Sequence, residues 1–377
     1  MTTLNVVVDE VLSTIPTGLS RYSEELTRAL IRYAPPGCFV EGIVSSSPEQ
    51  DYQSLTERLP GLTGLFKSAL TRRDLRSAWQ HGFTPVPSGM IHAPSLFAPL
   101  RNHDRVNTRG SQITVTIHDV AAWTHPDLLP PRQVSWTRAM AQRAFKYADA
   151  IVVPTHAVAA ELEGILGFGD RVRVLGAAVG STIVAQSDEK RRAERLGLPE
   201  RYLLTTGNSG PGSGISALLD ALASLARVDI PLIVAGTENR PGAVAAAVSE
   251  AGLPPERVVS LPDLSDADLS VVLARATAFV YPTVISGFGM PMLEAFRFGR
   301  AVIHSDAAAL VEVAGDAGLS VPAANRETYP LLLAEAIENV LADDDLRNRL
   351  GVLGTDRAKL FSWRAPAEGV WQLQADL

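Results

Sequence analysis

The stretch that decides the fold reads Ser286-Gly287-Phe288-Gly289-Met290-Pro291-Met292-Leu293-Glu294-Ala295. It follows the apolar run Ala278–Tyr281, which predicts a buried strand, and a short loop over 282–285. Glycines let the backbone approach a ligand closely, and proline suits the first turn of a helix, whose free N–H groups and positive dipole end favour phosphate. Glu294 lies about one turn into that helix, where its carboxylate can accept hydrogen bonds from hydroxyls such as those of a ribose. The segment therefore predicts a seat for a nucleoside diphosphate.

Strand and helix signals alternate along the rest of the chain, which predicts an α/β protein with parallel sheets. The expected strands are Leu4–Val8, Phe39–Val44, Thr114–Ile117, Ala150–Val153, Val172–Leu175, Leu203–Thr206, Leu232–Ala235, Val258–Leu261, Ala278–Tyr281, Ala301–His304 and Leu319–Pro322. The clearest expected helices are Ser20–Tyr33, Val134–Ala148, Ile215–Ala226, Ala267–Ala276 and Tyr329–Leu341. Most of the strands are short and aliphatic, as strands buried on both faces are.

A chain of 377 residues is too long for one ordinary core, so two domains are expected. We place the first over 1–179 and the second over 180–362, with a hinge at Gly176–Gly180. Ligands of doubly wound sheets bind beyond the carboxyl ends of the strands, so a cleft between the two domains is the expected site.

The composition excludes several classes of protein. A net charge of −7 argues against non-specific binding to nucleic acid, and the single Cys38 excludes internal disulfides. The N-terminus runs directly into a strand, so we expect no signal peptide, and no apolar stretch approaches the ~18–20 residues that span a bilayer. A cytoplasmic protein is expected.

The segment 286–295 resembles the signature of the retaining glycosyltransferases of family 4, the group 1 transferases, in which two glutamates flank a Gly-Phe-Gly. The second glutamate is Glu294, and Ser286 stands in place of the first. The resemblance implies the GT-B fold, in which two doubly wound Rossmann-like domains face each other across a cleft and a last helix, here 363–377, packs back on the first domain. It also implies transfer of a sugar from a nucleotide-sugar to a glycan, lipid-linked or small-molecule acceptor, without a metal or other cofactor.

The resemblance also implies roles for particular residues. His118 and Asp119, which end a strand in Thr116-Ile117-His118-Asp119, are expected near the transferred sugar, with the His118 imidazole donating a hydrogen bond to a hydroxyl. His92 is a weaker candidate for the acceptor side. Residues expected to contact the donor are Gly18, Ser20, Arg21, Gly207, Asn208, Ser209, Ser213, Leu264, Ser286, Gly287, Phe288, Gly289, Met290, Pro291, Met292, Leu293 and Glu294. A purely structural interpretation remains open for Ser20 and for Ser265 or Asp266, each of which can be a helix N-cap.

Three positions depart from the family pattern. Gly212 and Ser213 occupy the places where relatives carry an Arg and a Lys that grip the diphosphate, and Ser286 replaces a glutamate. The glycines and N–H groups of 207–214 can still form an anion nest, but the departing diphosphate has no cationic partner there. The alternatives are therefore a catalytically impaired relative that acts as a partner or scaffold subunit, and a nucleotide-sugar epimerase, which shares the architecture.

The stretch 59–83 combines apolar side chains with Lys67, Arg72, Arg73 and Arg76. One interpretation is a basic amphipathic helix that touches the cytoplasmic face of a membrane carrying a lipid-linked acceptor. The other is a segment that packs one face on its own domain.

Overall fold

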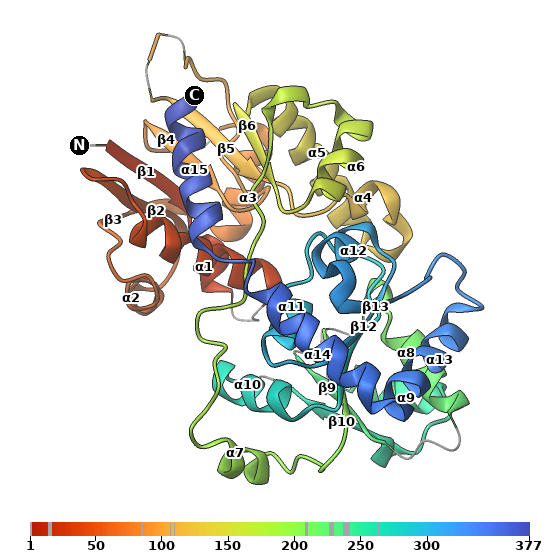
Figure 1. The fold of residues 1–377 in the computed structure, drawn as a ribbon. Coiled ribbons are helices and arrows are strands. Elements are labelled where there is room, and N and C mark those ends of the chain that lie inside the picture. The colour runs from red at the N-terminus through yellow and green to blue at the C-terminus, as the bar shows by residue number, and fades with distance from the viewer. Residues whose placement is uncertain are drawn as a thin grey trace. The chain divides into compact units, whose positions relative to one another are not determined.

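The computed structural model describes residues 2–13, 17–83, 86–105, 107–108, 110–207, 210–225, 230–236, 242–262 and 264–377. The chain divides into two compact units (Figure 1). One comprises 1–177 together with 362–377, and the other comprises 178–361.

The first unit is built on a parallel sheet that has seven strands among the described residues, in the order β3-β2-β1-β4-β5-β6-β7. The strands are β1 (Thr2–Val7), β2 (Cys38–Ser46), β3 (Gly64–Thr71), β4 (Met90–Ala93), β5 (Gln112–Thr116), β6 (Ala150–Val153) and β7 (Val172–Val174). The helices are η1 (Asp9–Leu12), α1 (Gly18–Arg32), α2 (Glu49–Arg58), α3 (Arg72–His81), α4 (Ala121–Thr124), η2 (Pro126–Leu128), α5 (Pro131–Tyr147), α6 (His156–Leu166), η3 (Gly169–Arg171) and α15 (Arg364–Asp376).

The C-terminal helix α15 belongs to this first unit although it lies at the far end of the chain. Its Trp371 Nε1 donates to the Leu30 carbonyl of α1 at 3.0 Å. Gln374 Nε2 donates to Thr114 Oγ1 of β5 at 2.8 Å, and Gln112 Nε2 donates to Gln374 Oε1 at 2.8 Å. Figure 1 shows α15 beside α1 and the strands β4 and β5.

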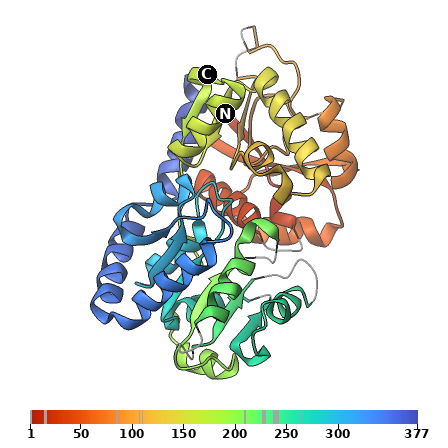
Figure 2. The same cartoon turned by 90° about the vertical axis from the view of Figure 1, so that its right-hand side faces the viewer.

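The second unit has a parallel sheet with six described strands in the order β10-β9-β8-β11-β12-β13. They are β8 (Leu203–Thr206), β9 (Leu232–Ala235), β10 (Val258–Leu261), β11 (Ala278–Tyr281), β12 (Ala301–Ser305) and β13 (Gly318–Val321). The helices are α7 (Glu189–Arg195), η4 (Pro211–Ser213), α8 (Ile215–Ser224), α9 (Ala243–Glu250), η5 (Pro255–Arg257), α10 (Asp266–Arg275), α11 (Met290–Arg297), α12 (Ala308–Ala314), η6 (Gly315–Ala317), α13 (Tyr329–Ala342) and α14 (Asp344–Ala358). Figure 2 shows helices on both faces of this sheet.

The order of the strands places the functional edge of each sheet. In the second unit β8 pairs with β9 on one side and β11 on the other, so successive strands are added in opposite directions from β8. The loops that follow β8 and β11 therefore meet at a topological switch point, which is the usual ligand position in an open parallel sheet. In the first unit β1 has the same position, between β2 and β4.

The expected strands are present, with ends that differ by one or two residues, and the expected α/β architecture with parallel sheets is confirmed. Two strands of the first unit were missed. The proposed amphipathic helix over 59–83 is wrong in its first half, because residues 64–71 form β3, paired with β2 from Glu41↔Gly64 to Val44↔Lys67. Only 72–81 is helical. His92 lies within β4 with a fully buried side chain, so it does not line an acceptor surface.

Candidate functional site

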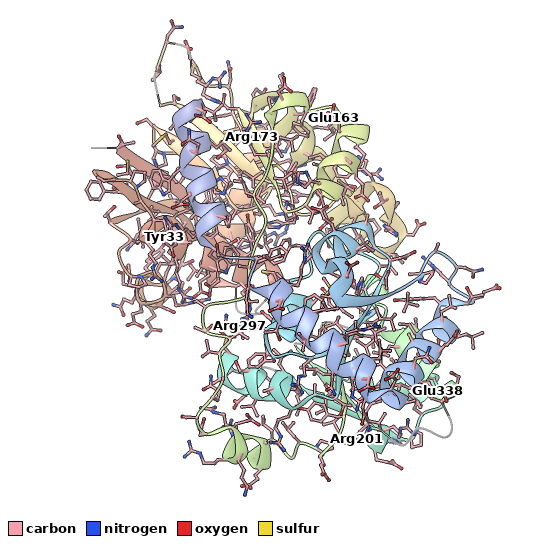
Figure 3. All side chains as sticks on the ribbon, in the orientation of Figure 1. Tyr33, Glu163, Arg173, Arg201, Arg297 and Glu338 are labelled. Carbon is pink, nitrogen blue, oxygen red and sulfur yellow. The ribbon has the colours of Figure 1, made fainter. Side chains whose placement is uncertain are left out.

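The quoted segment forms a glycine turn and a helix, as predicted. Gly289 precedes α11 with φ of +87°, a backbone conformation that favours glycine, and a Cβ at this position would also displace Leu310 Cδ2, which lies 2.5 Å away. Pro291 lies in the first turn, and no side chain caps the N-terminus of α11. The helix ends at Arg297, labelled in Figure 3. Its uncapped start leaves backbone N–H groups and a positive dipole end available to an anion.

Glu294 lies in the second turn of α11 and its side chain is buried. It is close to Tyr281, the last residue of β11, and Ser286 hydrogen bonds with the same phenol. Burial raises the pKa of Tyr281 to about 12, so the phenol stays neutral; the hydrogen bond with Ser286 lowers this pKa and the negative charge of Glu294 raises it, both to a smaller extent. Tyr281 was not among the predicted site residues, although its position at the carboxyl end of a strand was a usable signal.

The glycine loop that follows β8 is described from Gly210 onward. Ser213 Oγ donates to the Gly210 carbonyl at 2.7 Å, and Gly214 has φ of +71°. A Cβ on Gly214 would lie 2.1 Å from the Pro282 carbonyl oxygen, which no rearrangement of side chains relieves. Asn208 and Ser209 lie outside the described residues. Loop 210–214 is therefore packed against its neighbour, and that contact requires glycine at position 214.

The neighbour is loop 282–285, which joins β11 to the quoted segment. Val284 N and Thr283 Oγ1 both donate to the Gly212 carbonyl, at 3.1 and 2.9 Å. A Cβ on Gly212 would lie 2.6 Å from Ile285 Cδ1. The two loops that flank the switch point thus form one hydrogen-bonded unit, and Ile285 fills the space beside Gly212.

Two residues from elements distant in sequence donate hydrogen bonds to the carbonyls of loop 282–285. Tyr329 Oη of α13 donates to the Pro282 carbonyl at 2.9 Å, and Ser305 Oγ of β12 donates to the Thr283 carbonyl at 2.5 Å. Both side chains are buried. We call Thr283, Ser305 and Tyr329 the loop clamp. Sequence reasoning did not find it, because nothing local marks a Ser or Tyr as the partner of a loop carbonyl 22 or 47 residues away.

The last donor residue expected in this unit is Leu264, which is half-buried just before α10. The N-cap of α10 is Ser265, whose Oγ accepts from Asp268 N at 3.1 Å. The structural interpretation of Ser265 is therefore confirmed. Gly207 follows β8 with φ of +135°, and its N–H donates to the Ala235 carbonyl.

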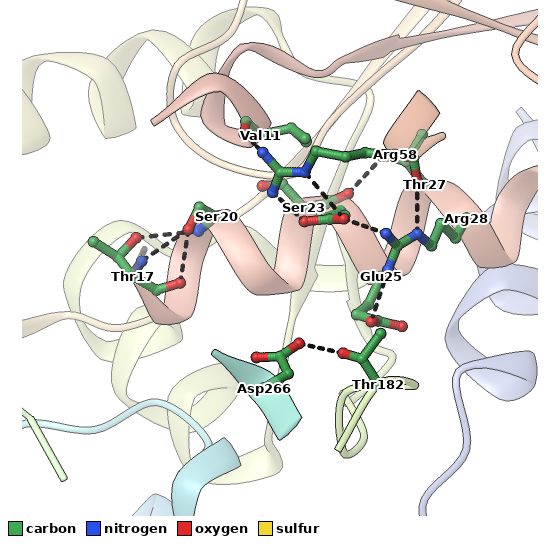
Figure 4. Close-up of polar contacts among 11 residues, drawn as sticks. Val11, Thr17, Ser20, Ser23, Glu25, Thr27, Arg28, Arg58, Thr182 and Asp266 are labelled. Carbon is green, nitrogen blue, oxygen red and sulfur yellow. Dashed lines mark hydrogen bonds and ion pairs between the residues drawn. The ribbon is translucent and has the colours of Figure 1, made fainter. Parts of the chain in front are cut away.

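In the first unit, Gly18, Ser20 and Arg21 open α1, and Thr17 is the N-cap rather than Ser20 (Figure 4). Ser20 is the third helical residue of a reciprocal capping box: Ser20 N donates to Thr17 Oγ1 at 3.1 Å, and Thr17 N donates to Ser20 Oγ at 2.8 Å. The Ser20 hydroxyl also donates to the Thr17 carbonyl at 2.9 Å. This hydroxyl is therefore used in holding the start of the helix, whichever ligand the backbone approaches.

His118 lies just beyond the carboxyl end of β5. Its Nε2 is 2.7 Å from the Pro94 carbonyl, and its ring meets the Tyr22 ring edge-on with 4.5 Å between centroids. A carbonyl only accepts, so Nε2 carries the proton. Burial lowers the pKa of His118, so the ring is neutral and Nδ1 is an acceptor. Asp119 next to it accepts from Ala121 N at 2.9 Å. Because the N–H of the ring is already used, His118 would accept a hydrogen bond from a hydroxyl through Nδ1, whereas donation was expected from the sequence.

Comparison with known proteins agrees with the two-domain geometry. The model for "Glycosyltransferase Family 4" matches residues 16–179, and the model for "Glycosyl transferases group 1" matches residues 200–343. The chain is 26% identical over 374 residues to O-antigen chain mannosyltransferase B of Escherichia coli, covering 92% of this chain and 93% of that protein. It is 26% identical to the MMP alpha-(1->4)-mannosyltransferase of Mycolicibacterium hassiacum, over 80% of this chain and 77% of that protein.

Among solved structures, Anabaena HepE in complex with UDP and glucose matches with a TM-score of 0.75 over all of both chains, at 14% identity. Two Rossmann-like units with this element order and these structural neighbours define the class: the protein has the GT-B fold. With the two family models matched in succession along it, the chain belongs to the group 1, family 4 glycosyltransferases.

No described helix is long and apolar enough to cross a membrane.

Proposed function

We propose that this protein transfers a glycosyl unit from a nucleoside-diphosphate sugar to a hydroxyl of an acceptor, with retention of configuration at the anomeric carbon. The observation that carries the proposal is the joined pair of loops at the switch point of the second sheet. Loops 210–214 and 282–285 are hydrogen bonded through the Gly212 carbonyl, and the uncapped start of α11 follows directly. Backbone N–H groups in this arrangement suit a diphosphate.

The geometry of the second unit and the family resemblance support the following donor contacts. The backbone N–H groups of Phe288, Gly289 and Met290 would hold phosphate oxygens. Pro291 has no N–H group, and those of Met292 and Leu293, expected from the sequence to contribute, already donate to the Gly289 carbonyl. Glu294, buried beside Tyr281, would accept hydrogen bonds from the ribose hydroxyls. Tyr281 and Ser286 would present neutral hydroxyls to the sugar in place of the missing carboxylate. The family resemblance assigns His118 to the transferred sugar, as an acceptor through Nδ1.

In the reaction, the bond between the anomeric carbon and the diphosphate breaks as the acceptor oxygen attacks the same face, and the acceptor proton passes to the departing diphosphate. The transition state has oxocarbenium character, so its stabilisation depends on holding the negative charge of the leaving group. Because positions 212 and 213 carry no cation, oriented N–H groups would do this work. We propose that this step requires no metal or other cofactor.

The named relatives support this choice of reaction. The two curated relatives described above are mannosyltransferases, and HepE was solved with UDP and glucose, so nucleoside-diphosphate hexoses, with UDP-glucose among them, are the first donors to test. The acceptors named for these relatives favour a carbohydrate acceptor, such as a growing glycan. A scaffold subunit and an epimerase are less well supported, because the relatives named above are transferases.

The test is a calorimetric titration with a panel of nucleoside diphosphates and their sugars, followed by assays of sugar release and transfer. We expect at least one diphosphate to bind, and its sugar to be transferred with retention, determined by NMR of the anomeric proton. Binding without turnover of any donor, with carbohydrate acceptors present, would favour the scaffold interpretation. Interconversion of the sugar without an acceptor would favour the epimerase.

A further inference from the structure

The first unit carries an arginine whose charge has no partner in the described part of the chain. Arg76 lies on α3, one turn after Arg72, and its guanidinium carbon is 3.8 Å from the centre of the Trp136 ring on α5. No described carboxylate or carbonyl hydrogen bonds with this guanidinium. Its side chain is exposed at the surface. The indole fixes the plane of the guanidinium, so its N–H groups are presented in a defined orientation.

Arg72, one turn earlier, is in the opposite situation. Its Nη1 donates to Asp9 Oδ2 at 2.6 Å and to the Asp9 carbonyl at 2.9 Å, and its Nη2 is 2.7 Å from Glu10 Oε2. The two nearest carboxylates are therefore committed to Arg72. Glu10 offsets the charge of Arg76 only in part: burial and repulsion by Arg72, which are larger, lower the pKa of Arg76.

These residues lie at the functional edge of the first sheet. Arg72 begins α3 directly after β3, and Asp9 and Glu10 directly follow β1. Glu10 also acts on His118, whose pKa its negative charge raises slightly against the effect of burial. Arg76 lies one turn further along α3, and the same Glu10 charge that acts on His118 also acts on Arg76.

The Arg76 guanidinium is therefore accessible, oriented by the indole and not paired with a described carboxylate, so its N–H groups are available to an anion. The geometry points to a binding site for an anionic oxygen group, in which Arg76 on the Trp136 ring holds a phosphate carried by the acceptor. A planar guanidinium binds two phosphate oxygens at once, which is why phosphate is the chemistry proposed here. The assignment to the acceptor, rather than to another anion, depends on the proposed function.

The test compares Arg76→Gln with Arg73→Gln. Arg73 is the matched control, because it is an exposed arginine on the same helix with no aromatic ring beneath it. Methyl phosphate and acetate are titrated by calorimetry at constant ionic strength. We expect methyl phosphate to bind in preference to acetate, its affinity to fall at least about tenfold in Arg76→Gln, and Arg73→Gln to remain within about twofold. Trp136→Leu should also weaken binding, because it removes the surface that orients Arg76.

Two outcomes would overturn the proposal. One is unchanged phosphate affinity in Arg76→Gln, and the other is an equal loss in Arg73→Gln, which would indicate a diffuse basic surface. Vesicles containing phosphatidylglycerol separate the sources of phosphate: vesicle binding that depends equally on both arginines, without binding of methyl phosphate, would identify a membrane surface instead. Nucleoside-diphosphate affinity, measured on the same proteins, should not change in Arg76→Gln. A protein that binds no nucleoside diphosphate would contradict the proposed function, whereas loss of the Arg76 effect on methyl phosphate would contradict only the phosphate site.

Discussion

Ile285 Cδ1 lies 2.6 Å from the position that a Cβ on Gly212 would occupy, so a side chain at position 212 would clash with Ile285 unless Ile285 moved. The family pattern that the sequence resembles implies a cation near this place, and here the apolar side chain of Ile285 fills the space. The loop is therefore not a flexible remnant, because Gly212 also accepts hydrogen bonds from Thr283 and Val284. The glycine at position 212, where the family pattern has a cation, and the Ile285 side chain beside it therefore pack together.

The first prediction follows from that contact. Gly212→Ala should weaken nucleoside-diphosphate binding and lower stability by about 1–3 kcal/mol, the usual cost of overpacking. Ile285→Ala should have a smaller effect on the affinity, and the double variant should recover most of it, because the alanine at 285 leaves room for a Cβ at 212. A double-mutant cycle on affinity and urea midpoint measures this coupling. Additive effects would show that the two residues act independently. Restoring a cation by Gly212→Arg should likewise require Ile285→Ala.

The second prediction concerns Glu294. Glu294→Ala should reduce nucleoside-diphosphate affinity roughly tenfold to a hundredfold, since removing a charged hydrogen-bond partner costs about 1.5–3 kcal/mol. Glu25 in the first unit is a control, because it is also buried and its loss should alter stability alone. Calorimetry on Glu294→Ala and Glu25→Gln, both checked by circular dichroism, distinguishes the cases. Unchanged affinity in Glu294→Ala would remove this residue from the donor site.

The third prediction is that chelation leaves the transferase reaction intact. Among the described residues, no group of three or more His, Cys, Asp or Glu side chains is arranged to hold a metal ion. Dialysis against EDTA, followed by assay with and without added Mg²⁺ or Mn²⁺, should change the rate by less than about twofold if N–H groups alone stabilise the leaving diphosphate. A strong, reversible loss would show that a divalent ion accompanies the donor.

The sequence predicted the strands of the second unit well, because each is a short aliphatic run bounded by turn residues. It failed where the pattern was ambiguous. Leu65, Phe66 and Leu70 also fit a helical spacing, and only pairing with β2 makes 64–71 a strand. In β4, a buried histidine interrupts the apolar run, and it is accommodated by Thr114 Oγ1, 2.9 Å from His92 Nδ1. Tertiary partners of this kind are absent from any local pattern.

In the candidate site, too, some features could be predicted from the local sequence and others depend on tertiary contacts. Gly289, Pro291 and Glu294 were visible because backbone conformation and helix position restrict which residues fit there. The direction of the His118 hydrogen bond was not, since it depends on the Pro94 carbonyl, 24 residues away. The unpaired charge of Arg76 was hidden for a related reason: its isolation depends on Arg72 taking both nearby carboxylates.

The fourth prediction concerns acid stability. Burial, assisted by the nearby His118, lowers the pKa of His92 to about 3, against about 6.5 in an unfolded chain. Between these values the unfolded state binds more protons, so stability should fall as the pH drops below 6.5, by up to about 1.4 kcal/mol per pH unit for this group. His103 acts in the opposite direction: its hydrogen bond to Asp149 raises its pKa, so its contribution is present below pH 6.5 and lost at higher pH.

Urea denaturation of wild type and His92→Asn between pH 4 and 7 tests whether His92 causes stability to fall as the pH drops. Asn retains a polar group near Thr114 but does not titrate, so the variant should show a shallower loss of stability toward acid. Equal slopes in the two proteins would mean that His92 is not the group responsible.

The fifth prediction isolates the loop clamp. Tyr329→Phe removes the hydroxyl that donates to the Pro282 carbonyl, leaving a buried acceptor without its partner at a cost of about 1–3 kcal/mol. Tyr202→Phe is the matched control, since Tyr202 Oη donates to the Val272 carbonyl at 2.7 Å and is equally buried in the same unit. We expect both variants to lose similar stability. Only Tyr329→Phe should also weaken nucleoside-diphosphate binding, severalfold, and raise KM for the donor more than it lowers kcat, because loop 282–285 leads directly into the phosphate-binding turn. If both variants leave donor affinity unchanged, the clamp stabilises the fold without positioning the donor.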